Sequence, residues 1–191
     1  MRRLMMGIVV FLMAFSVSAQ EETVLDQDFY YSGFGAGVFS FSRVKEKGAL
    51  FIGGRGGVII NQTFILGIGG YLLANNITAP PPDDDLYLNM VYFGAEVGYI
   101  HDPDRFIYFY ISSLIGFGSS TLRDAEFNEM ADEDFFFALE PAACLMVNVT
   151  PAFRVGLGGS YRYVSGVTEY GLSNTSLSGL SFNVMFEFGS F

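Results

Sequence analysis

Apolar residues alternate with small or polar residues, at a period of two, through several long segments of this chain of 191 residues. The alternation is clearest in the segment 152–164, where Phe153, Val155 and Leu157 share one face. Because successive side chains of a β-strand point to opposite faces, this period predicts strands. Eight segments show it with varying clarity: Ser32–Arg43, Ala49–Ile60, Phe64–Ala74, Tyr87–Ile100, Arg105–Gly118, Asp134–Asn148, Ala152–Val164 and Gly179–Phe191.

The composition excludes several classes of protein. With 51% hydrophobic and 17% aromatic residues, the chain is too apolar to be disordered. Its 20 acidic and 10 basic residues argue against nucleic-acid binding, which requires clustered Lys and Arg. A single cysteine, Cys144, excludes a disulfide framework.

The first residues have the three parts of a cleavable secretory signal. Arg2 and Arg3 precede the apolar run Leu4–Phe15, and the small residues of Ser16–Ala19 follow. A membrane anchor is the alternative, but twelve helical residues cover about 18 Å of a bilayer core of about 30 Å. The sequence predicts three regions: a signal peptide over 1–19, a periplasmic segment over 20–31 and a barrel over 32–191.

An exported chain this apolar is expected to be an all-β protein, an eight-stranded antiparallel up-and-down transmembrane β-barrel. The predicted strands are long enough to cross a bilayer at a tilt. A soluble ligand-holding barrel such as a lipocalin is the alternative, but its charges would lie outside. Here the apolar face is continuous, and the minor face carries charges summing to zero, which we expect to pair inside the barrel. These charged residues are Arg55, Glu96, Glu140, Arg154, Arg162 and Glu187.

From the second connection onward, short and long connections alternate along the chain. This is typical of outer-membrane barrels, which have short periplasmic turns, longer external loops and periplasmic termini. Two of the long connections are acidic and are expected to lie outside the cell, either as solvated loops or as binding sites for Ca²⁺ or Mg²⁺. Their acidic residues are Asp83, Asp84, Asp85, Asp124, Glu126, Glu129, Asp132 and Glu133.

The segments Phe51–Asn61 (FIGGRGGVIIN) and Gly67–Tyr71 (GIGGY) give the chain a family resemblance. The mature chain resembles the small outer-membrane β-barrels of Gram-negative bacteria, most specifically uncharacterised barrels of Bacteroidetes-type bacteria. The resemblance implies a fold and a location in the bacterial outer membrane. Chains of this kind usually end in an aromatic residue preceded by alternating apolar residues; Phe191 is present, but Glu187 and Gly189 depart from that pattern.

Catalytic side chains are scarce. His101, the only histidine, lies in a predicted turn beside Asp102, and one His with one Cys does not make an ordinary zinc site. We therefore expect no enzyme, cofactor or metal, and a structural or surface-binding barrel with a filled interior. A narrow channel is the alternative, and a lipid-modifying enzyme a remote one. The expected partners are outer-membrane lipid, lipopolysaccharide and the barrel-insertion machinery, for a monomeric protein.

Overall fold

The computed structural model describes residues 30–44, 47–78, 86–123, 133–168 and 172–191. The predicted signal peptide and most residues of the predicted acidic loops lie outside this part of the chain. The described strands are β1 (Tyr31–Val44), β2 (Lys47–Ile60), β3 (Phe64–Leu73), β4 (Ile77–Thr78), β5 (Tyr87–His101), β6 (Ile107–Arg123), β7 (Asp134–Thr150), β8 (Phe153–Ser165) and β9 (Gly179–Gly189). One short helix, α2 (Asn174–Leu177), precedes β9.

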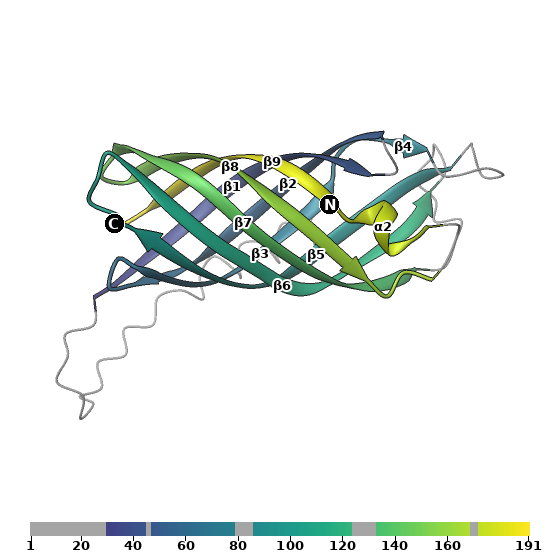
Figure 1. Cartoon of the computed structure of the whole chain (residues 1–191), viewed down its shortest axis with the longest axis horizontal. Helices are drawn as coiled ribbons and strands as arrows, with labels where there is room; N and C mark the ends of the chain where they lie inside the picture. Colours follow the sequence, from purple (N-terminus) through teal and green to yellow (C-terminus); the bar gives the residue numbers. More distant parts are fainter. Residues whose placement is uncertain (1–29, 45–46, 79–85, 124–132, 169–171) are drawn as a thin grey trace, which may run out of the picture.

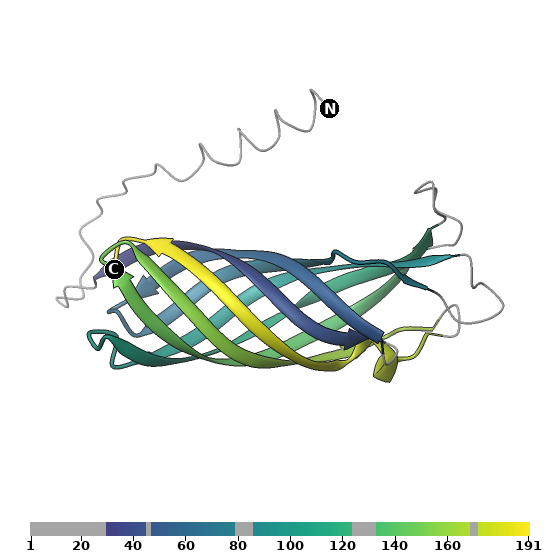
Figure 2. The ribbon, with the colours of Figure 1, turned by 90° about the horizontal axis from the view of Figure 1, so that it is seen from above.

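The strands form one closed antiparallel barrel. Neighbours follow the order β3-β2-β1-β9-β8-β7-β6-β5-β4, and an additional pairing of β3 with β5 closes the sheet. That pairing runs from Phe64 opposite Tyr99 to Leu72 opposite Val91. Figures 1 and 2 show the result as an elongated cylinder of tilted strands. The prediction of eight long antiparallel strands in an up-and-down barrel is therefore confirmed.

The two ends of the barrel differ. One end, here called the turn end, carries the short connections β2–β3, β5–β6 and β7–β8, the start of β1 and the end of β9. The three-residue β2–β3 connection has positive φ at both Asn61 (51°) and Gln62 (56°), and the Thr63 amide closes it by donating a 3.0 Å hydrogen bond to the Ile60 carbonyl oxygen. The other end, the loop end, carries the long connections and α2.

Some predicted boundaries were wrong. The connection predicted over 119–133 begins later, because β6 stays paired with β5 as far as Arg123 opposite Tyr87. The connection predicted over 165–178 contains α2, where Ser173 caps the helix by accepting a hydrogen bond from the Ser176 amide. The last strand was predicted to run to Phe191, but β9 ends at Gly189.

The two faces of the barrel follow the period of two seen in the sequence. Buried residues fill the interior in two apolar clusters, one around Phe51, Met90 and Leu177 and one around Phe34 and Met146. The outer face exposes large apolar side chains, including Phe64, Phe93, Phe117, Phe135 and Leu180. Among the described residues, no helix has the length and apolar content needed to cross a membrane.

Interior glycines make room for large neighbours. At Gly118 in β6, an added Cβ would lie 2.5 Å from the Phe136 ring and 2.5 Å from the Val91 carbonyl oxygen. On the outer face the situation is opposite: at Gly37 in β1, nothing lies within 4 Å of an added Cβ. Glycine therefore serves packing at the first position and not at the second.

We predict that Gly118→Val lowers the free energy of unfolding by about 3 kcal/mol, because a β-branched side chain would overpack the interior. Gly37→Val is the matched control and should be neutral or slightly stabilising, because a β-branched residue suits an exposed strand position. Urea unfolding of the protein in lipid vesicles measures both. Equal stability of the two variants would contradict the packing role of Gly118.

Candidate functional site

The six charged residues of the minor face all lie inside the barrel in the described structure. Their exposed fractions are 9% or less. They come from β2, β5, β7, β8 and β9 and occupy successive levels between the two ends. The residues are Arg55, Glu96, Glu140, Arg154, Arg162 and Glu187.

The pair Arg55 and Glu96 forms a direct ion pair near the middle of the barrel. The Nη1 of Arg55 lies 2.9 Å from the Oε1 of Glu96, and both side chains are at most 5% exposed. The same carboxylate oxygen accepts a 2.6 Å hydrogen bond from the Tyr110 hydroxyl, and the Tyr110 ring lies 4.8 Å from the guanidinium carbon. A charge-assisted pair of this length offsets much of the desolvation of both groups.

Glycines in β3 let this pair form. Arg55 stands on β2 and Glu96 on β5, so β3 lies between them. The β3 residue opposite Arg55 is Gly69, and the β3 residue opposite Glu96 is Gly67. Because neither glycine has a side chain, the guanidinium can reach across the strand to the carboxylate.

The pair Arg154 and Glu187 is looser. These residues stand opposite each other on β8 and β9, near the turn end. The Nη1 of Arg154 lies 3.8 Å from the Oε1 of Glu187, which is beyond hydrogen-bond distance. The guanidinium is stacked instead on the ring of Phe191, 3.4 Å from its centroid. The prediction that Phe191 continues the last strand was wrong: β9 ends at Gly189, and the Phe191 ring lies over this buried cation.

Glu140 lies in a hydrogen-bonded chain that crosses the interior. Its carboxylate accepts 2.6 Å hydrogen bonds from the hydroxyls of Tyr92 and Ser160. The Ser160 hydroxyl in turn accepts a 3.0 Å hydrogen bond from the Asn183 amide. This chain links β5, β7, β8 and β9, so it ties opposite walls of the barrel together.

Arg162 has no carboxylate within 4.0 Å among the described residues. Its side chain is fully buried, and its Nε donates a 2.9 Å hydrogen bond to the Leu177 carbonyl oxygen at the end of α2. The guanidinium carbon lies 4.2 Å from the Phe51 ring centroid and 5.6 Å from that of Tyr92. Both terminal nitrogens lack a hydrogen-bond partner in the described structure.

Sequence reasoning did not identify the uncharged partners of these charges. Tyr92, Tyr110 and Ser160 stood on the minor face of their strands, beside the charges, and that placement was the available signal. Which hydroxyl meets which carboxylate depends on register and tilt, which the alternation alone does not fix.

The predicted acidic loop residues are mostly outside the described residues. Glu133 is described and exposed, whereas Asp134 begins β7, is buried and accepts a 2.8 Å hydrogen bond from the Thr168 amide. His101 ends β5 at the turn end, and its Nε2 lies 3.8 Å from the Asp102 carboxylate with both side chains largely exposed. Within the described ranges, no group of three or more His, Cys, Asp and Glu side chains could hold a metal ion.

We predict that Glu96→Gln lowers the free energy of unfolding by about 3–5 kcal/mol, because it leaves the Arg55 charge buried without compensation. The double variant Arg55→Met with Glu96→Gln should recover most of this loss, since it removes both charges. Unfolding in urea, followed by the mobility of heated and unheated protein in electrophoresis, measures these values.

The exposed ion pair of Arg105 with Asp102, at 3.0 Å, provides the control. Asp102→Asn should change stability little, because exposed ion pairs contribute little. A double variant no more stable than Glu96→Gln alone would contradict the assigned role of the Arg55 charge.

Comparisons with known proteins concern the fold. No family model matches the chain, and a search of curated proteins gives no match. Neisserial surface protein A aligns with a TM-score of 0.64 and 12% identity over 86% of this chain and 100% of that chain. The attachment invasion locus protein Ail of Yersinia pestis, solved with the heparin analogue sucrose octasulfate, aligns at 0.49 and 11% identity over 84% of this chain and 98% of that chain. The predicted link to Bacteroidetes-type barrels is not shown by these comparisons, whereas the likeness to the neisserial protein shows a shared fold of closed antiparallel β-barrel.

Proposed function

We propose that the chain is a non-enzymatic outer-membrane β-barrel with a side-chain-filled interior, which acts structurally or binds at the surface through acidic external loops. Three features support this location. The outer face is apolar over the eight long strands, the first residues have the pattern of a secretory signal, and the fold is that of a protein named for the bacterial surface. Backbone groups in lipid must be satisfied within the protein, and a closed barrel does this.

The observation that carries the filled interior is the size of the space beside the central charges. A cavity of about 20 Å³ lies among Arg55, Glu96 and Glu140, which is room for about one water molecule. Toward the loop end, the fully buried Leu177 of α2 and its apolar neighbours cover the interior. A continuous aqueous path through these residues would require side chains to move, so the filled barrel is favoured over the channel.

The alternation of connections supports an orientation. Outer-membrane barrels place short turns and both termini in the periplasm and long loops outside. We propose this orientation here, so that the acidic loops 79–85 and 124–133 face the medium. Their carboxylates would repel anionic lipopolysaccharide directly but could be bridged to its phosphates by divalent cations.

The remaining partners follow from the location. Lipid and lipopolysaccharide would surround the apolar outer face, and the barrel-insertion machinery would meet the C-terminal strand during assembly. We propose a monomer, because eight strands already complete a closed sheet without a second chain.

We predict little steady ion conductance for the protein in planar lipid bilayers. The interior charges and their hydroxyl partners fill the path that ions would take. Removing three of them together, by Arg55→Ala, Glu96→Ala and Glu140→Ala, should raise the conductance, provided that electrophoresis shows the variant still folds. A large, stable conductance of the unaltered protein would replace this proposal with the channel.

The orientation has its own test. Protease added to intact cells should cut within 79–85 and 124–132 and spare the turn at His101–Asp104. Cleavage at that turn on intact cells, with the long connections spared, would show that the barrel is inserted the other way round. Permeabilised cells serve as the control, because both ends should then be accessible.

A further inference from the structure

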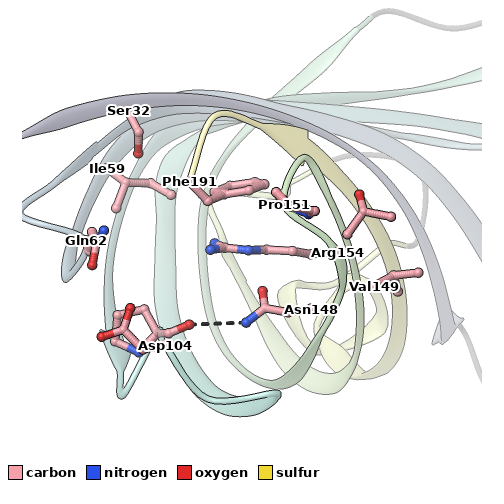
Figure 3. A pocket seen from close by; sticks show the side chains of 11 residues that line it. Ser32, Ile59, Gln62, Asp104, Asn148, Val149, Pro151, Arg154 and Phe191 are labelled. Carbon is pink, nitrogen blue, oxygen red and sulfur yellow. Dashed lines mark hydrogen bonds between the residues drawn. The ribbon is translucent and has the colours of Figure 1, made fainter.

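A pocket of about 410 Å³ opens at the turn end of the barrel. Its walls come from the start of β1, the three short turns and the C-terminus, and they include Ile59, Val149 and Pro151. Figure 3 shows Arg154 pointing into the middle of this space, with Phe191 beside it. One wall is fixed by Asn148, whose side-chain amide donates hydrogen bonds to the carbonyl oxygens of Pro103 (3.2 Å) and Arg105 (2.7 Å).

Arg154 is incompletely hydrogen-bonded in this pocket. The carboxylate of Glu187 is 3.8 Å away, whereas the matching distance in the central pair of Arg55 and Glu96 is 2.9 Å. The Nε of Arg154 and the hydroxyl of Ser32 have no hydrogen-bond partner among the described residues, and both atoms are buried, so the terminal nitrogens of Arg154 are the ones that a ligand could reach. The side chain is 8% exposed, so the guanidinium is largely withdrawn from water but still borders the pocket.

Two aromatic side chains lie close to the Arg154 guanidinium and limit which of its atoms a ligand can contact. The guanidinium carbon lies 3.4 Å from the Phe191 ring centroid and 5.2 Å from that of Tyr108. Arginine N–H groups lie in the plane of the guanidinium and match a carboxylate in a two-point contact. Phe191 covers the face of the guanidinium and the Tyr108 side chain interacts with part of its edge, so the remaining terminal N–H groups are the part that can meet a ligand.

We propose that this pocket binds a monocarboxylate with a small apolar group, independently of whether the lumen conducts. The carboxylate would accept hydrogen bonds from the terminal N–H groups of Arg154, and the apolar group would lie against Ile59, Val149 and Pro151. A single negative charge suits the site better than two, because Glu187 lies nearby and the exposed Asp104 stands at the rim. The ligand is therefore a carboxylic acid, either free in solution or as the C-terminus of a peptide.

The test is a titration of the refolded mature protein in zwitterionic micelles, followed by the NMR signals of labelled methyl groups. Isobutyrate represents a free acid and N-acetylalanine a peptide C-terminus. We expect saturable shifts of the Ile59 and Val149 methyl signals with at least one of them, and the tighter ligand identifies the source. Isobutylamine, which has the opposite charge, and inorganic phosphate should bind more weakly or not at all.

The Ile68 methyl signal controls for partitioning of the ligand into the micelle, because Ile68 is 57% exposed on the outer face. Arg154→Lys keeps the charge but loses the planar N–H edge, and it should weaken binding by about tenfold. Arg105→Gln removes an exposed charge at the same end and should leave the affinity unchanged.

Val149→Trp provides a variant that leaves Arg154 in place. Val149 is exposed at the pocket wall, so the larger side chain should narrow the pocket without disturbing the barrel, and binding should be lost. Three results would overturn the proposal: no saturable shift with either acid, equal shifts at Ile68, or an affinity that Arg154→Lys and Val149→Trp leave unchanged. Heat-modifiable mobility in electrophoresis establishes that each variant is folded.

Discussion

The pairing of β3 with β5 is the interaction on which the rest of the structure depends. Without it, two long strand edges would expose unpaired N–H and C=O groups, which is costly in water and more so in lipid. With it, each of the eight long strands has a neighbour on both sides. Closure at eight strands then fixes a narrow interior that side chains must fill. The interior glycines follow from this limit, because Tyr71 and Phe136 occupy space that a Cβ at Gly53 or Gly118 would need.

The same narrow interior explains how charges can lie inside the barrel. At this width, a side chain on one strand can reach a group one or more strands away, as Arg55 reaches Glu96 across the glycines of β3. The hydroxyls of Tyr92 and Tyr110 complete these contacts by donating to the carboxylates. Each buried carboxylate thus receives hydrogen bonds or a positive charge within a low-dielectric space, where an unpaired charge would be strongly destabilising.

Much of the fold could be predicted from the sequence. Alternation of apolar and polar residues indicates a β-strand, and it also indicates on which face of the sheet each residue lies. Even the glycine-rich strands β2 and β3 were placed nearly at their observed bounds, since their flanking apolar residues and the turn at Asn61 delimit them. The contacts of the interior could not be predicted in the same way. They depend on register, and a register is a relation between strands that are distant in sequence. Nothing in the local sequence indicates that Arg162 meets the carbonyl of Leu177, or that Phe191 turns inward over Arg154.

The guanidinium groups of the interior arginines Arg55, Arg154 and Arg162 have different kinds of partner at different levels of the barrel. Arg55, in the middle, has a carboxylate at 2.9 Å, and Arg162, at the loop end, has a backbone carbonyl and the Phe51 ring. Arg154, at the turn end, has a distant carboxylate and two rings, and it borders the pocket of about 410 Å³. The Phe191 ring attracts the guanidinium through its face but accepts no hydrogen bond in the plane of the group. The middle of the barrel is therefore closed by direct ion pairing, whereas the turn end keeps N–H donors that a ligand can use.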